Sequence, residues 1–238
     1  MIYGRELSND VVDKLREHGI NIGIEERGGF RIYHREGGFP EGLIEKIVKS
    51  SGSLIVYPVH STQYEVSSFL LFRLKSPLVV APRSSFAIYV KAPISVGIYV
   101  DEDNARRLID FFGSSQFKYA LYGSSASGVI CRFYRTDVYL DAPSRQNIWE
   151  ATTKISIENS SDEFVEVRNV VYPLLNADVY IDDTGNAYIE AAHLSIKRDG
   201  VGTVLLKNEA PFTGLKRCPQ PFMGLLGKIG KFDMEFGL

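Results

Sequence analysis

Lys118-Tyr119-Ala120-Leu121-Tyr122-Gly123 is followed, across a serine-rich turn, by Gly128-Val129-Ile130-Cys131-Arg132-Phe133-Tyr134. Both stretches are rich in aromatic and β-branched residues, and the flanking glycines suit a tight connection, so they predict a β-hairpin. If Gly123 pairs with Gly128, Arg132 lies opposite Tyr119, where its guanidinium can stack on the ring. Both faces of this hairpin are mainly apolar. We therefore expect it to run through the middle of a sheet that is covered on both sides.

Two cations, Lys118 and Arg132, interrupt the apolar faces of the hairpin. A charged side chain in a covered sheet needs a polar partner or a route to solvent. They are interpreted as structural charges satisfied by the protein's own acids; the alternative is a pocket in which they hold an anionic ligand or a partner carboxylate. The candidate ligand- or partner-binding residues are Lys118, Tyr119, Tyr122, Arg132 and Tyr134.

Outward from the hairpin, short β-prone runs punctuated by Gly, Pro, Asn and Asp predict a mainly β fold. Three short helices are expected near residues 8–19, 40–48 and 103–113. Strands are expected at residues 20–26, 30–34, 54–59, 69–74, 78–80, 86–91, 95–100, 117–122, 129–135, 138–140, 153–158, 164–172, 179–181, 187–191 and 203–206.

The pattern becomes purely β after a polar, proline-containing stretch at residues 141–145. It predicts two portions: residues 1–145, an N-terminal α+β portion with mixed strands, and residues 146–238, an immunoglobulin-like β-sandwich with a basic C-terminal tail.

Composition narrows the class of protein. The chain has 238 residues, of which 45% are hydrophobic, and its formal net charge is −2. A packed core is expected, and no global positive field favours nucleic acid. Cys131 and Cys218 stand apart and are interpreted as free thiols of a cytoplasmic protein; a long-range disulfide is the alternative. The N-terminus shows no signal peptide, and the apolar region 69–100 carries too many charges and prolines to cross a bilayer.

The sequence contains no complete catalytic or cofactor motif. Gly123 and Gly128 have the spacing of a phosphate-binding loop, but Val129 and Ile130 occupy the positions where that loop needs Lys and Ser or Thr. Acidic residues around Gly185 resemble a calcium loop, but their spacing favours a hairpin turn. The four histidines have no ligand spacing. No metal and no cofactor is therefore expected.

The C-terminal segment 219–238 combines apolar side chains with Lys228 and Lys231, and it follows an acidic region, residues 149–190. We interpret it as a final strand or arm packed on the protein's own core. Contact with a membrane surface or with a partner groove is the alternative.

The hairpin residues 118–123 and 128–132 resemble an archaeal family known as domain-of-unknown-function family 432. The similarity extends over most of the chain, including Ile155-Ser156-Ile157-Glu158-Asn159 and the end Phe232-Asp233-Met234-Glu235-Phe236-Gly237. The resemblance implies an archaeal, cytoplasmic protein without an assigned activity, and a link to the regulation of small-conductance mechanosensitive channels. Low Gln and Cys usage fits a thermophilic source.

Together these patterns predict a non-enzymatic binding or interaction module. Its expected partner is another protein or a second copy, with the Lys118/Arg132 hairpin and the basic tail as contact surfaces; a small anionic ligand is an alternative. The competing hypothesis is an enzyme or small-ligand binder with a pocket between the two portions, on which Cys131, His60 or Tyr122 would converge.

Overall fold

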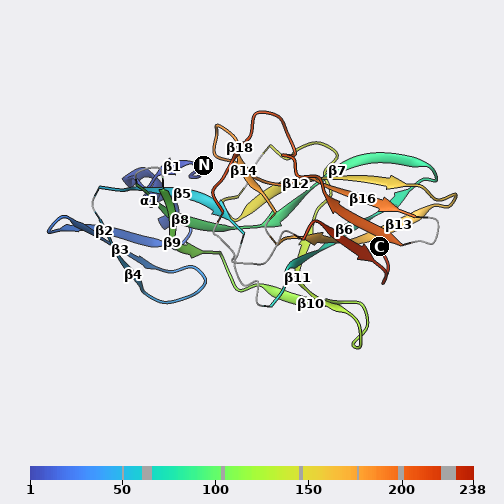
Figure 1. Ribbon diagram of the computed structural model, residues 1–238, viewed down its shortest axis with the longest axis horizontal. Helices are drawn as coiled ribbons and strands as arrows, with labels where there is room; N and C mark the ends of the chain where they lie inside the picture. Colours follow the sequence, from blue (N-terminus) through green and yellow to red (C-terminus); the bar gives the residue numbers. More distant parts are fainter. Residues whose placement is uncertain are drawn as a thin grey trace.

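A computed structural model describes residues 1–49, 51–60, 66–102, 105–144, 147–175, 177–197, 201–220 and 229–238. The molecule is elongated, with an N-terminal lobe at one end and a larger lobe at the other (Figure 1). Nearly all regular structure is strand, so the predicted mainly β fold is confirmed. No helix among the described residues is long and apolar enough to cross a membrane.

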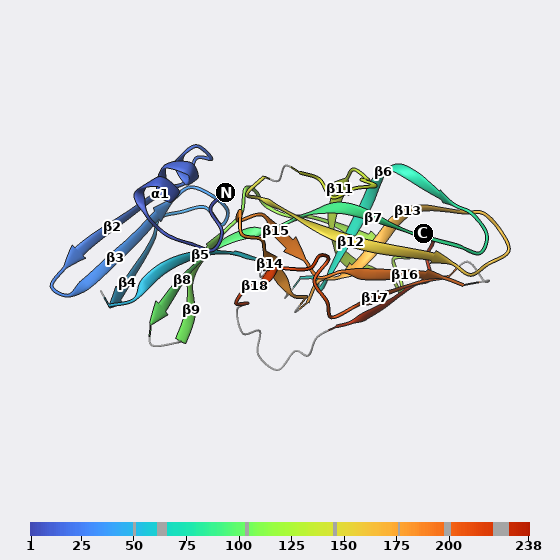
Figure 2. The ribbon, with the colours of Figure 1, turned by 90° about the horizontal axis from the view of Figure 1, so that it is seen from above.

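The N-terminal lobe consists of two sheets and the helix α1 (Asn9–Arg16), which buries Val11 and Leu15. A four-stranded sheet has the order β1-β5-β8-β9, and a three-stranded sheet has the order β2-β3-β4 (Figure 2). Their strands are β1 (Arg5–Glu6), β2 (Asn21–Arg27), β3 (Phe30–Glu36), β4 (Ile44–Lys49), β5 (Ser53–Val59), β8 (Ser95–Glu102) and β9 (Ala105–Phe112).

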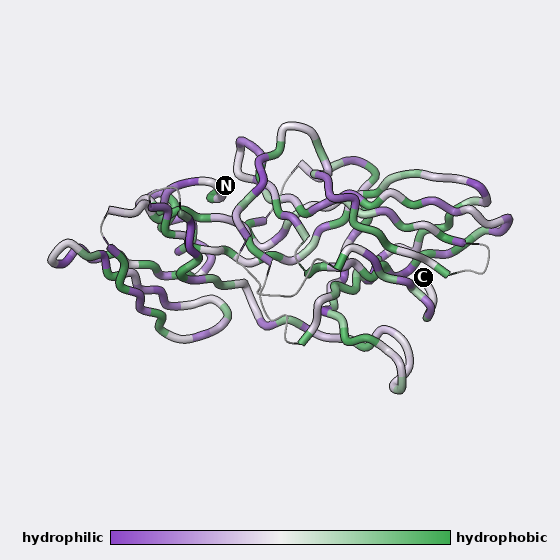
Figure 3. The backbone as a smooth tube through the Cα atoms, viewed as in Figure 1, coloured by the Kyte–Doolittle hydropathy of each residue, from purple (hydrophilic) through white to green (hydrophobic). Residues whose placement is uncertain are grey.

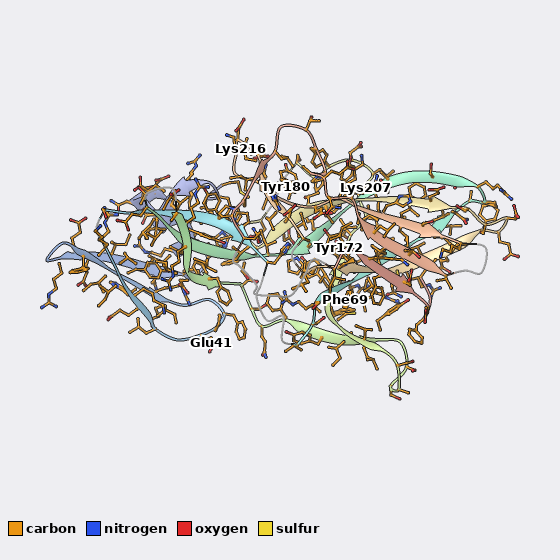
Figure 4. All side chains as sticks on the ribbon, in the orientation of Figure 1. Glu41, Phe69, Tyr172, Tyr180, Lys207 and Lys216 are labelled. Carbon is orange, nitrogen blue, oxygen red and sulfur yellow. The ribbon has the colours of Figure 1, made fainter. Side chains whose placement is uncertain are left out.

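The larger lobe is formed by two sheets in a sandwich-like arrangement, with side chains of both filling the space between them (Figure 4). The first has the order β10-β11-β6-β13, and β11 and β6 run parallel. Its strands are β6 (Phe69–Val80), β10 (Lys118–Tyr122), β11 (Val129–Thr136) and β13 (Val165–Pro173).

The second sheet of this lobe has the order β18-β14-β15-β12-β16-β17-β19, and β7 pairs with the free side of β12. The immunoglobulin-like detail of the prediction stays a prediction. The strands are β7 (Ser84–Pro93), β12 (Glu150–Asn159), β14 (Val179–Ile181), β15 (Ala187–Ile189), β16 (Ala192–Ile196), β17 (Gly202–Leu206), β18 (Lys216–Arg217) and β19 (Lys231–Met234).

The lobes differ from the two portions expected from the sequence. β6 pairs with β13, and β7 pairs with β12, so strands from both sides of residues 141–145 share each sheet of the larger lobe. A separation at those residues would cut both sheets. The chain instead crosses between the lobes several times, as the connections β7 to β8 and β9 to β10 show.

One of the three predicted helices is confirmed, as α1, and two are wrong. Residues 44–49 form β4, in which Ile44 and Val48 share one face and the exposed Ile47 lies on the other. Residues 105–112 form β9, and a bulge at Ile109 interrupts its alternation. In both segments a single displaced apolar residue gives a strand the i, i+3, i+4 spacing of a helix. Asp103 of the third prediction lies outside the described residues.

A buried ion pair joins the two sheets of the N-terminal lobe. Arg35 Nε of β3 donates to Asp110 Oδ2 of β9 at 2.7 Å, and the Tyr33 hydroxyl donates to the same oxygen at 2.8 Å. Both partners of the pair are shielded, with side-chain exposures of 0% and 6%. Burial, together with the Asp110 carboxylate, raises the pKa of Tyr33, which keeps its hydroxyl a donor.

Replacement of Asp110 by Asn should lower the free energy of unfolding by about 3 kcal/mol or more, because it leaves the Arg35 guanidinium buried without its counter-charge. Asp101→Asn is the matched control, since it breaks the more exposed pair with Arg106 and should cost less than about 1 kcal/mol. Urea unfolding measures both. Equal, small losses would contradict a structural role for the buried pair.

Candidate functional site

The β10–β11 hairpin has the predicted register. Tyr119 pairs with Arg132 and Lys118 with Phe133. The turn is closed by Gly128 N, which donates to Ser124 O at 2.7 Å. The predicted hairpin turn at residues 123–128 is therefore confirmed.

The predicted central position of the hairpin is wrong. β10 is the edge strand of its sheet. Near the turn, Leu121 and Ile130 are 48% and 50% exposed, and Figure 3 shows this hairpin as a strongly apolar segment at the lower margin of the molecule. Apolar side chains on both faces of a strand pair do not determine whether another strand or another layer of the protein covers it.

The two cations of the hairpin lie on opposite faces and do not form one pocket. Arg132 is 2% exposed, and its guanidinium carbon lies 4.9 Å from the centroid of the Phe117 ring. Lys118 is exposed, at the start of β10. Because paired residues share a face, Lys118 belongs with Phe133 and Arg132 with Tyr119. Arg132 is a core residue, whereas Lys118 is accessible to a ligand.

The three predicted tyrosines have different surroundings. The Tyr122 hydroxyl donates to Gly237 O at 2.8 Å, and its ring contacts Phe232 and Phe236, so it anchors the C-terminal arm. Tyr119 is half-buried opposite Arg132. Tyr134 donates to Glu150 Oε1 at 2.9 Å, at the junction of the lobes. Of the predicted site residues, the structure therefore brings only Lys118 and Tyr134 into the same cavity.

That cavity, which we call the inter-lobe cleft, has a volume of about 510 Å³. Four segments build it: the end of β7, the connection from β9 to β10, the strand β11, and the turn that leads into β12. Clefts between lobes are frequent ligand sites. Its main side chains are Phe117, Lys118, Phe133, Tyr134, Arg135, Trp149 and Glu150.

Trp149 fixes the wall of the inter-lobe cleft. Its ring meets the rings of His18 and Phe112 edge-on, at centroid distances of 5.9 and 6.3 Å. Its carbonyl accepts a hydrogen bond from Ile94 N at 3.0 Å. The tryptophan immediately precedes β12 of the larger lobe, while its ring packs on the N-terminal lobe.

The charges of the inter-lobe cleft are unevenly compensated. Glu150 forms an ion pair with Lys91 at 3.0 Å and also accepts from Tyr134. Burial, then the Glu150 carboxylate, raises the pKa of Tyr134, so this hydroxyl remains a donor. Within the part of the chain that the structure describes, no acidic side chain pairs with Lys118 or Arg135. The cleft thus offers two exposed cations beside aromatic rings.

Arg135 and Trp149 are among the cleft residues that were not predicted as site residues, together with Phe117, Phe133 and Glu150. The register offered a signal for Arg135, because it lies two residues after Phe133 on the same strand and therefore shares the face of Lys118. Trp149 gave no comparable signal, since its position depends on contacts with the other lobe.

The residues of the enzyme hypothesis do not converge on the inter-lobe cleft. Cys131 is buried in β11, and burial raises its pKa to about 12; Cys218 is likewise a free buried thiol with a pKa of about 12. His60 is 1% exposed, and its Nε2 donates to Ala177 O at 2.8 Å. The thiols are therefore protonated at neutral pH and shielded from substrates.

Two basic residues just before the C-terminal segment 219–238 neutralise carboxylates of the acidic region. Lys216 and Arg217 form ion pairs with Asp183 and Asp178, and Lys231 pairs with Asp233 of its own strand. β19 pairs with β17, as expected for a packed arm, whereas residues 221–228 lie outside the described residues.

The turn after β14 confirms the prediction for the segment around Gly185. Asp182 Oδ1 accepts from Thr184 N and Asn186 N, both at 2.9 Å. The carboxylate thus closes an Asx-type turn, which accounts for the acidic residue at this position.

His60 should make the stability depend on pH. Burial, reinforced by the charge of Arg132, lowers its pKa to about 4. Between pH 6.5 and 4 the unfolded chain binds a proton that the folded chain does not, so stability is fully present above this window and falls as the pH is lowered, by about 1.4 kcal/mol per unit.

His60→Gln should remove this contribution, and urea unfolding at neutral and mildly acidic pH measures it. At pH 5 the wild-type protein should have lost roughly 2 kcal/mol more than the variant. The carboxylates titrate in both proteins and cancel in the comparison. If the free energies of unfolding of the two proteins fell in parallel as the pH is lowered, the pKa of His60 would not be lowered in the folded protein.

Comparison with known proteins gives one match. A family model described as "Protein of unknown function (DUF432)" matches residues 2–224, whereas no curated protein and no solved structure matches. The matched range includes the hairpin, the inter-lobe cleft, the N-terminal lobe and the larger lobe without β19. The chain therefore belongs to the DUF432 family.

Proposed function

We propose that this protein is a non-enzymatic binding module that holds an anionic group in the inter-lobe cleft. The observation that carries the proposal is the pair of exposed cations, Lys118 and Arg135, which line one cavity and have no acidic partner in the described chain. A carboxylate or sulfonate between them would gain charge-assisted hydrogen bonds, and a guanidinium can bind it in a bidentate manner.

The aromatic side chains of the cleft favour a ligand with a flat, apolar part. Phe133, Tyr134 and Trp149 are half-buried. Each ring is therefore held in place by its neighbours, while part of its apolar surface stays accessible to a ligand. Such rings bind a ligand at a low cost in conformational entropy. The chemistry that fits the cleft is therefore an aromatic anion, either as a small molecule or as part of a partner.

Binding without catalysis is supported by the state of the polar groups. Glu150 is engaged by Lys91 and Tyr134 together, and Cys131 and His60 lie outside the cleft.

The exposed pair Leu121 and Ile130 favours a protein partner for the hairpin. Contact with a partner there, and a role beside a mechanosensitive channel, stay predictions.

The test uses Trp149, which is the single tryptophan of the sequence and lines the cleft. Anilinonaphthalene sulfonate, an aromatic anion, should bind saturably and accept excitation energy from Trp149. The double variant Lys118→Gln/Arg135→Gln should weaken this binding by about tenfold or more, because it removes two charge-assisted contacts.

Arg27→Gln/Lys197→Gln is the matched control, with the same change in net charge at two exposed positions outside the cleft. It should bind the probe as the wild type does. Urea unfolding must show that both variants are folded, since the probe also binds partly folded chains. Unchanged affinity in the cleft variant would refute the proposal.

A further inference from the structure

A second cavity, of about 690 Å³, opens between the two sheets of the N-terminal lobe. It lies beside the edge strands β4 and β9, which end their respective sheets, and we call it the N-lobe mouth. It shares no lining residue with the inter-lobe cleft. Its volume is that of a site for a small organic ligand.

The pairing register shows which side chains of β4 face the interior of the lobe. Tyr33 faces inward, because its hydroxyl reaches Asp110 of the opposite sheet. Lys46 pairs with Tyr33, and Val48 lies two residues further along β4, so both share this inward face.

The opposite sheet contributes a matching set. Ile98 pairs with Asp110 and therefore lies on the inward face, and Val100 follows it by two residues. Arg107 pairs with Val100 and shares that face, while Ile109 is the extra residue of the bulge. The N-lobe mouth thus has apolar walls formed by Val48, Val100 and Ile109, and it also contains the ion pair of Lys49 with Glu102 and one further cation from each sheet, Lys46 and Arg107.

These two cations differ from their charged neighbours on β4 and β9. Lys49 forms an ion pair with Glu102 at 3.2 Å, and Arg106 pairs with Asp101 at 2.6 Å. In the described part of the chain, no acid pairs with Lys46 or Arg107. The inward faces of packed sheets are normally apolar. Two inward cations above apolar walls are therefore complementary to a molecule with an anionic head and an apolar tail.

We propose that the N-lobe mouth binds a monomeric single-chain anionic amphiphile of the fatty carboxylate class. Lys46 and Arg107 hold the carboxylate, and the alkyl chain lies along Val48, Val100 and Ile109. Removal of the chain from water supplies affinity in proportion to the apolar area that is covered, and the two cations select the charge of the head.

The experiment is calorimetric titration of the full chain with dodecanoate below its micellar concentration. Dodecanoate should bind saturably, whereas acetate, which has the head without the chain, and dodecyltrimethylammonium, which has the opposite charge, should not. Lys46→Gln/Arg107→Gln should weaken dodecanoate binding by about tenfold or more. Arg27→Gln/Lys197→Gln, which removes two exposed cations outside both cavities, should leave it unchanged.

A charge-reversal variant distinguishes loss of binding through the changed charge from loss of binding through misfolding. Lys46→Glu/Arg107→Glu should reject dodecanoate and bind dodecyltrimethylammonium. Undiminished dodecanoate binding in the Lys46→Gln/Arg107→Gln variant, or loss of binding in the Lys118→Gln/Arg135→Gln variant alone, would overturn the proposal. The proposal would also be overturned if the protein sedimented with phosphatidylglycerol vesicles but did not bind monomeric dodecanoate, because the ligand would then be a bilayer surface.

Discussion

The antiparallel pairing of β7 with β12 is the constraint on which the architecture depends. Its register runs from Ser84 opposite Asn159 to Pro93 opposite Glu150, and it ends where the chain crosses between the lobes. The ladder therefore fixes the last residues of β7 and the first residues of β12 at one place. Those residues supply the Lys91–Glu150 ion pair and carry Trp149 against the N-terminal lobe. The inter-lobe cleft is a consequence of this pairing, since the end of β7 and the start of β12 form two of its walls.

Burial divides the cations of the protein into two functional groups. Arg35 is enclosed with Asp110 and Tyr33, and Arg132 is enclosed against the Phe117 ring, so both contribute to specifying the fold. Lys118 and Arg135 at the cleft, and Lys46 and Arg107 at the N-lobe mouth, remain in contact with solvent. A buried cation must be satisfied within the fold, whereas an exposed cation that forms no ion pair keeps its capacity for an external anion. The two proposed sites rest on this difference.

The parts of the fold that depend on local chemistry could be predicted. The β10–β11 register, the Asp182 turn and helix α1 follow from turn residues and short-range periodicity. The helices expected at residues 40–48 and 103–113 were wrong because Ile47 and Ile109 disturb a period of two. β16 was missed although it carries the local signal of a strand, since buried Ala192, Leu194 and Ile196 alternate with half-buried His193 and Ser195. Of the predicted site, Lys118 and Tyr134 line the cleft, whereas Tyr119, Tyr122 and Arg132 do not.

The sequence by itself determined that the chain is strand-rich and where its tightest hairpins turn, because these properties are set by neighbours a few residues apart. Only the tertiary structure decided that β10 lies at an edge, that Lys118 shares a cavity with Arg135 rather than with Arg132, and that Trp149 closes that cavity. Each of these depends on which distant strand supplies the next neighbour. Period-two patterning gives a residue its face, but not the layer that covers the face.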